Sequence, residues 1–296
     1  MAEKYPGFDA SAMLAQINAS LNRHVQGMAK SVLGYQRIGE IAAASLAPFT
    51  SGVRQIATPQ LDWVAGFTRD FGRIAEEALA EFRRSLPPNL RHLDGVEFTP
   101  ILALADEGIT LWAVPRAQIA DRLLRAQTTR ARRRILGSSA DDILHDCSVV
   151  AVAGAAGPYA DLARLLEQAI RVIRAGELAA GQALAASVLD TLMRVSFTED
   201  DRKRLIAHKR SARSQVTPVD HFDEYDFAFA MVMRPVWFAY RPQDTAEQRA
   251  ASSTFARHGS AHHIRGRQVS KRNAVQSVML AAALLDLLAV LDRERS

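Results

Sequence analysis

The stretch that decides the fold runs from Phe255 to Arg293 and reads FARHGSAHHIRGRQVSKRNAVQSVMLAAALLDLLAVLDR. Its first part, up to Asn273, is unusually dense in arginine, histidine and serine. Its second part predicts one apolar helix, whose packing face carries Ala274, Val278, Ala281, Leu284, Leu285, Leu288 and Leu291 at helical spacing. We therefore expect a helical bundle built on this helix, with any chemistry located just before it.

The composition is that of a globular chain. A length of 296 residues suggests about two domains, and 48% hydrophobic with 23% charged residues argues against wholesale disorder. Lys+Arg 37 against Asp+Glu 32 gives a net charge of +5, which permits a polyanionic partner without requiring one. The single cysteine, Cys147, excludes an intramolecular disulfide framework and is expected in the core.

The N-terminal residues suggest no export signal, because Met1 to Ala10 carries charges and Pro6 and lacks an apolar region. The longest apolar run, Val278 to Leu291, contains Asp286 and is shorter than the roughly 20 residues that cross a bilayer. We expect a soluble cytoplasmic protein with no membrane partner.

The remaining patterns favour an all-α fold in two parts. An apolar stripe of period three to four predicts a helix over Leu61 to Leu86, which Pro87 ends. One short β element is expected around residues 109–115, where β-branched and aromatic residues lie between Gly108 and Pro115. A boundary near Ser138 then separates a helical N-terminal region, 1–138, from a helical bundle, 139–296.

Two charged clusters each allow two interpretations. The basic cluster is either a solvated helix face or a phosphate-contacting patch; it comprises Arg130, Arg132, Arg133 and Arg134. The acidic run caps a helix or pairs with arginines, or else supplies a base or binds a cation; it comprises Asp220, Asp223, Glu224 and Asp226.

Several common sites are absent from the sequence. Neither GxxxxGK[ST] nor GxGxxG occurs, and no GxSxG elbow is present, so a nucleotide-hydrolysing motor or a hydrolase of that type is excluded. His258 and His262 are four residues apart and could ligate a metal together with Asp220, His221 or Asp223. HEXXH context and nearby thiols are missing, and we expect no metal and no cofactor.

Arg257 and His262 form an Arg-x4-His motif with the polar His258 directly after the arginine. On an ideal helix five residues separate two side chains by about 140°, so they converge only if the helix starts or bends between them, which Gly259 permits. A histidine with a pKa near 6.5 can exchange a proton with a ribose 2′-hydroxyl, and an arginine can hold the scissile phosphate. The pair therefore suits metal-independent RNA cleavage.

This motif, followed by Ser270 and by Asn273-Ala-Val-Gln-Ser-Val-Met-Leu280, resembles the C-terminal signature of HEPN-like helical proteins. The resemblance covers roughly Tyr159 to Arg293. It implies a bundle that dimerises and joins two motifs into one ribonuclease site, with Arg257 on phosphate, His262 catalytic and His258 the adjacent polar partner. It also implies toxin or abortive-infection activity against phage, with RNA, an antitoxin or a phage-derived trigger as partners. The most familiar members carry Asn in the place of His258.

The same residues also allow a purely structural role. Arg257 could pair with Asp223 or Asp226, and His262 could be a satisfied histidine at a helix junction. The alternative function is then a non-enzymatic, oligomeric interaction or regulatory protein that docks through the helix over Leu61 to Leu86. Ser270 and Asn273 are expected to form the start of the last helix.

Overall fold

A computed structural model describes residues 86–91, 98–206, 227–242, 254–261 and 268–295, together with the single residues 80, 84, 208 and 225. The chain divides into two compact units, one of residues 1–85 and 223–226 and one of residues 86–222 and 227–296. All the helices given below lie in the second unit.

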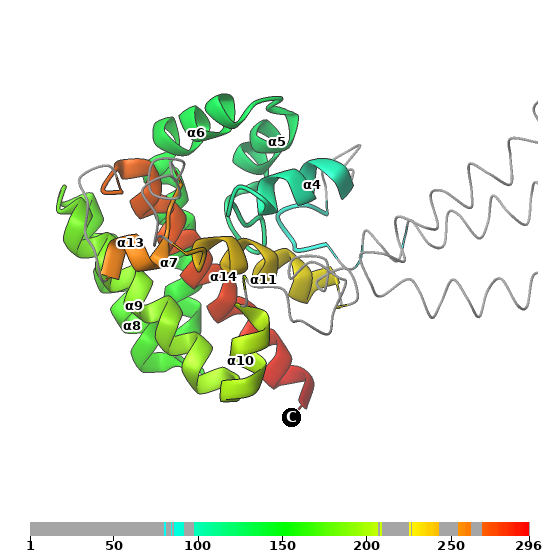
Figure 1. Cartoon of the computed structure of the whole chain (residues 1–296), viewed down its shortest axis with the longest axis vertical. Coiled ribbons are helices and arrows are strands. Elements are labelled where there is room, and N and C mark those ends of the chain that lie inside the picture. Colours follow the sequence, from blue (N-terminus) through cyan, green and yellow to red (C-terminus); the bar gives the residue numbers. More distant parts are fainter. Residues whose placement is uncertain are drawn as a thin grey trace, which may run out of the picture. The chain divides into compact units, whose positions relative to one another are not determined.

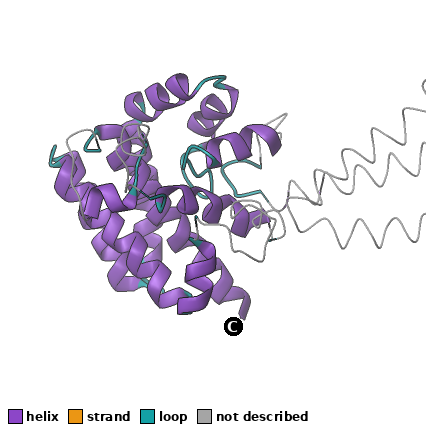
Figure 2. Ribbon diagram, viewed as in Figure 1, coloured by secondary structure: helices purple, strands orange, loops and turns teal. Residues whose placement is uncertain are grey.

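Every regular element in the described ranges is a helix, which confirms the all-α expectation (Figures 1 and 2). In chain order the helices are α4 (Phe98–Ala105), α5 (Ala117–Arg125), α6 (Thr129–Ser138), α7 (Ala140–Gly154), α8 (Ala160–Arg174), α9 (Leu178–Ser196), α10 (Glu199–Leu205), α11 (Phe227–Ala239), α13 (Arg257–Ala261) and α14 (Lys271–Arg295).

Helix α14 is the centre of the bundle. It packs against α9, α7, α8, α11 and α6 (Figure 1). Every residue from Asn273 to Leu285 is buried, so the helix has no solvent face over these positions. A helix that is apolar all round belongs in a core, and the single packing face expected from the sequence is thus too narrow a description. Small residues from Ala281 to Ala283 let the neighbouring helices approach closely.

Helices α8 and α9 form a closely packed pair. Gly176 follows α8 with φ +93, and the Gly176 and Glu177 amides donate to the Ile173 and Val172 carbonyls at 3.0 and 3.1 Å. A glycine in this left-handed conformation is a common end of a helix. A Cβ added at Gly181 of α9 would lie 2.3 Å from Ile173 Cγ1, so only glycine allows this approach.

The expected β element around 109–115 is wrong: this segment is a buried, bent loop. Its apolar residues are in the core, with Ile109 2% and Val114 0% exposed. Ala113 has φ 60 and the Val114–Pro115 peptide is cis, so the backbone is not extended. Asn89 Nδ2 donates to the Leu111 and Pro115 carbonyls at 3.1 and 2.7 Å, which replaces the bonds of a strand ladder. The β-branched and aromatic residues of this segment therefore indicate burial and not pairing in a strand.

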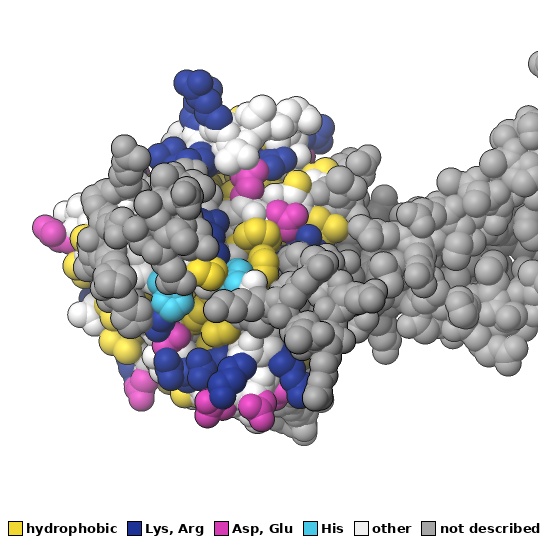
Figure 3. Space-filling view, in the orientation of Figure 1, with side chains coloured by type: hydrophobic (Ala, Val, Ile, Leu, Met, Phe, Trp, Pro, Cys, Tyr) yellow, Lys and Arg dark blue, Asp and Glu magenta, His cyan; other side chains and the backbone are white. Residues whose placement is uncertain are grey.

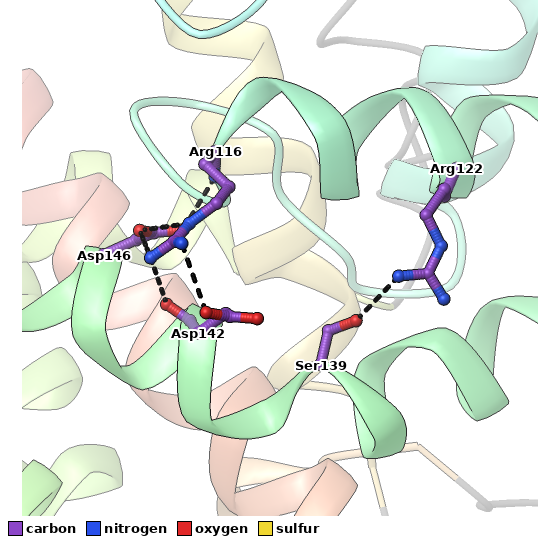
Figure 4. A network of polar contacts seen from close by, with 5 residues as sticks. All are labelled: Arg116, Arg122, Ser139, Asp142 and Asp146. Atoms are coloured by element: carbon purple, nitrogen blue, oxygen red, sulfur yellow. Dashed lines mark hydrogen bonds and ion pairs between the residues drawn. The ribbon is translucent and has the colours of Figure 1, made fainter.

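An ion-pair network fixes α5 on α7 (Figure 4). Arg116, just before α5, places Nη2 2.7 Å from Asp146 Oδ1 and Nη1 3.1 Å from Asp142 Oδ1. The Arg116 amide also donates to Asp146 at 2.8 Å. The hydrogen bond that Arg116 donates to Asp146 is the main reason that the pKa of Arg116 is raised. Further along, Arg122 Nη1 donates to Ser139 Oγ at 3.2 Å.

Helices α4 to α6 lie in the same compact unit as the later helices, although they precede Ser138, where the sequence places a boundary. Most of the helix predicted over Leu61 to Leu86 lies outside the described residues, and so does the acidic run from Asp220 to Asp226 apart from Tyr225. Cys147 is fully buried, as predicted.

Candidate functional site

Helix α13 begins at Arg257 and carries the whole Arg-x4-His motif except His262. The Arg257 side chain is only 11% exposed, and its Nη2 lies 2.9 Å from Oδ2 of Asp190 on α9. Neither Asp223 nor Asp226, the partners considered from the sequence, is among the described residues. The acid that meets the arginine is thus one that the sequence analysis did not select.

Asp190 is held by donors from three other elements or turns. Besides Arg257, Arg194 on the next turn of α9 donates from Nε to Asp190 Oδ2 at 2.7 Å. The Tyr240 hydroxyl donates to Asp190 Oδ1 at 2.9 Å. Burial acts to raise the pKa of Asp190, but the bond from Arg194, the charge of Arg257 and the bond from Tyr240 outweigh it and lower the pKa. Asp190 is therefore an ionised carboxylate that fixes Arg257.

Tyr240, just after α11, contacts both Asp190 and the motif. Arg257 Cζ is 5.7 Å from the centroid of the Tyr240 ring, within the range of a cation–π contact. The His258 ring meets the same ring edge-on, with centroids 6.3 Å apart and planes at 88°. Burial and then the Asp190 charge raise the pKa of Tyr240, so its hydroxyl remains a donor. Two residues of the predicted site, Arg257 and His258, thus both contact the Tyr240 ring.

A buried network of uncharged polar groups holds α13 against α9 and α14. Gln182 Nε2 of α9 donates to Ser260 Oγ at 2.6 Å and to the Gln268 carbonyl at 3.0 Å. Gln268 Oε1 accepts from the Ala256 amide at 3.2 Å. These side chains are at most 4% exposed. These bonds stabilise the position of α13, because moving the helix would break them in a buried place. Gln182 Oε1 itself accepts no bond in the described part of the chain.

Gly259 has a packing role in this network. A Cβ added there would lie 3.1 Å from Gln268 Cγ, so a larger residue would push α13 away from Gln268. The bend that the sequence analysis assigned to this glycine would concern His262, which lies outside the described residues together with His263, Arg265 and Arg267. The structure therefore brings together Arg257 and His258, and the position of His262 remains a prediction.

Ser270 and Asn273 start α14, as predicted. Ser270 Oγ accepts from the Asn273 amide at 3.2 Å, which is the geometry of an N-terminal cap. Asn273 Nδ2 donates to the Gln268 carbonyl at 3.0 Å. The Asn273 side chain thus also joins the last helix to the segment that carries the motif.

A second histidine lies near this site. The His208 ring stacks on Trp237 with centroids 4.0 Å apart and planes at 20°, and its Nε2 is 2.9 Å from the Trp237 carbonyl. Burial is the main cause that lowers the pKa of His208, and the nearby Arg241 and His258 act in the same direction. His208 is therefore mostly neutral at pH 7. Figure 3 shows histidine side chains next to hydrophobic ones on this face, and Lys and Arg side chains over α10.

Among the residues that the structure describes, no three His, Cys, Asp or Glu side chains lie close enough to hold a metal ion. One described helix, the Lys271–Arg293 part of α14, is long and apolar enough to cross a membrane, with a mean hydropathy of 2.1 over its best window. That window is 78% buried within the fold, as is usual for a core helix.

Comparison with models of known protein families found no match, and neither the curated protein sequences nor the solved structures contain one. The inference on function below therefore rests on the residues of this chain and on the resemblance of its motif.

Proposed function

We propose that this protein is a metal-independent endoribonuclease of the HEPN-like, toxin or abortive-infection type. In this proposal Arg257 holds the scissile phosphate, and His262 takes a proton from the ribose 2′-hydroxyl or returns one to the leaving oxygen. His258 is the adjacent polar partner. A second copy of the chain brings a second motif to the site, and an antitoxin or a phage-derived trigger controls it.

The observation that supports the proposal most is the way in which Arg257 is held. Asp190 at 2.9 Å and Tyr240 at 5.7 Å fix the guanidinium, and Gln182 and Gln268 fix the helix that carries it. A phosphate that meets a preorganised arginine costs less side-chain entropy than one that must order a mobile side chain. The His258 ring, partly exposed and held edge-on against the buried Tyr240 ring, lies next to it and can contact a base.

The same ion pair also favours a second candidate, a non-enzymatic oligomeric regulator. An arginine that is 11% exposed and bonded to Asp190 is also what a purely structural role requires. In that case deletion of residues 61–86 abolishes the biological effect, while a folded Arg257→Lys variant retains it. The ribonuclease proposal expects the folded Arg257→Lys variant to lose most activity, because lysine cannot bind phosphate through two parallel bonds.

The test of the proposed function is induction of the full-length protein in a bacterial host, with growth recorded and total RNA examined on a gel. Wild type should arrest growth and fragment RNA, and Arg257→Ala and His262→Ala should do neither. Arg194→Ala is the matched control, since it removes the more exposed partner of Asp190, 56% exposed, and leaves Arg257 in place. Equal toxicity of wild type and both motif variants would remove the motif from the mechanism.

A further inference from the structure

One arginine of α6 forms side-chain bonds within the described part of the fold, and the other three do not. Arg132 Nη1 lies 2.6 Å from Glu107 Oε1, and its Nε donates to the Ala126 carbonyl at 3.0 Å. In the described part of the chain, Arg130, Arg133 and Arg134 form no ion pair and no hydrogen bond through their side chains. The basic cluster of the sequence is thus partly structural and partly unexplained by folding.

Arg272 brings a further positive charge to this surface from the first turn of α14. A Cβ added at Gly137 of α6 would lie 3.3 Å from Arg272 Cγ, so the Arg272 side chain runs along α6. Burial, and then the charge of Arg272, lower the pKa of Arg133, and only Glu107 acts against this. Arg272 likewise has no acidic partner among the described residues. The fold therefore places two like charges side by side, which costs stability.

Other arginines without acidic partners have a local reason for their position. Arg171 and Arg174 lie in the last turn of α8, where the helix dipole favours a positive charge. Arg272 lies in the first turn of α14, where the dipole opposes it. Arg133 and Arg272 thus have no bonded partner in the described part of the chain and repel each other, whereas an anion would stabilise both.

We infer that Arg133 and Arg272, with Arg130 and Arg134 beside them, bind the phosphate backbone of single-stranded RNA. Guanidinium groups match the oxygens of a phosphate in pairs of hydrogen bonds, and side chains spread over one turn of α6 can meet more than one phosphate. Figure 3 shows Lys and Arg side chains over α6. This inference rests on the proposed function. The surface would hold the RNA substrate at phosphates distant from the bond that is cleaved.

The surface is connected to the candidate site through the start of α14. Gln268, four residues before Arg272, lies against Gly259 of α13, and α14 itself packs on α6 (Figure 1). An RNA strand bound across α6 and the start of α14 would therefore be led toward Arg257.

The experiment measures binding of a fluorescently labelled 20-nucleotide RNA by full-length protein in EDTA, over a series of KCl concentrations. All proteins carry His262→Ala so that the RNA stays intact. Each phosphate contact contributes about 0.7 to the slope of log affinity against log salt for a single strand. Arg133→Gln with Arg272→Gln should lower the slope by about 1.4, and Arg171→Gln with Arg174→Gln should leave it unchanged.

An unchanged slope in the Arg133/Arg272 variant, with an unchanged thermal melt, would overturn the inference. The inference would also be overturned if poly-glutamate of equal charge released the labelled RNA as readily as unlabelled RNA does. The surface would then bind acidic protein. The same loss of slope on the DNA version of the strand supports contacts to the phosphodiester backbone. If the salt slope falls in the Arg133/Arg272 variant but the protein with an intact His262 cleaves no RNA, the proposed function fails and the RNA-binding surface is supported. If that protein cleaves RNA but the salt slope of the variant is unchanged, the proposed function is supported and the RNA-binding surface fails.

Discussion

Arg257 of α13 and Arg133 of α6 are both partly buried, but the fold treats them in opposite ways. Arg257 has a carboxylate at 2.9 Å and an aromatic ring at 5.7 Å. Arg133 has Arg272 beside it, and its pKa is lowered by burial and by that charge. The first arrangement fixes one guanidinium in a defined place, and the second leaves positive charge for a ligand to neutralise. In the proposed function, the first region positions the anion and the second attracts it.

The largest difference between these regions should appear in stability. Arg257→Ala leaves the buried Asp190 with only Arg194 and Tyr240, so we expect the free energy of unfolding to fall by about 3 kcal/mol, at the low end for a broken buried pair. Arg272→Ala should change it by less than about 0.5 kcal/mol or raise it slightly, because a repulsion is removed. Urea denaturation checks both values. Equal losses in the two variants would mean that the comparison is wrong.

Asp190 gives this difference a pH dependence. Asp190→Asn should cost about 2 kcal/mol at pH 7, because Arg257 loses its charged partner. The folded-state pKa of Asp190 is lowered, so its contribution is present above the unfolded value of about 3.9 and is lost as the pH falls through the folded value. The gap between wild type and variant should therefore close below about pH 4. A gap that stays constant down to pH 2 would show that the charge of Asp190 is not what matters.

The uncharged network around α13 should contribute less than the ion pair. Gln182→Leu removes the donor to Ser260 and to the Gln268 carbonyl in a buried place, with an expected loss of about 1–2 kcal/mol. Gln127→Leu is the matched control, since Gln127 is exposed and makes one local bond to the Arg125 carbonyl. Thermal unfolding of both variants makes the comparison, and a neutral Gln182→Leu would remove the network from the positioning of α13.

The smallest expected effect concerns Asp286 on α14, which has one uncharged donor, Trp112 Nε1 at 2.9 Å, where Asp190 has three donors. Burial raises the pKa of Asp286, so its charged form opposes folding at pH 7. Asp286→Asn keeps an acceptor for Trp112 and should raise the free energy of unfolding slightly at pH 7, because the buried charge is removed. The gain should vanish as the pH falls through the folded pKa toward about 3.9. A loss of stability at pH 7 would contradict this reasoning.

The sequence predicts the helical class, the core helix over Asn273 to Arg293 and the capped start at Ser270, because each follows from local spacing and local bonds. It also selects Arg257 and His258, which the structure brings together on Tyr240. These features need no information from distant parts of the chain.

The partners of the site could not be predicted in the same way. Asp190 and Gln182 belong to α9, and they meet α13 only through the packing of helices that are far apart in sequence. One signal was present: both are polar residues within an otherwise apolar stretch, beside Leu189 and Leu192 in the case of Asp190. The loop over 109–115 was misassigned for a related reason, since burial by distant helices gives the same β-branched pattern as a strand.

The most direct test of the central claim is the rate of RNA cleavage by purified full-length protein in the presence of EDTA, for wild type, Arg257→Lys and His262→Ala with thermal melts recorded alongside. The proposal expects wild type to cut a single-stranded RNA without metal and to leave 2′,3′-cyclic phosphate ends. Both variants, still folded, should be slower by a factor of at least about 100, in line with the loss of one acid–base or phosphate-stabilising group. Cleavage by wild type that both folded variants match would contradict the claim, and the Arg257–Asp190 pair would then be structural only.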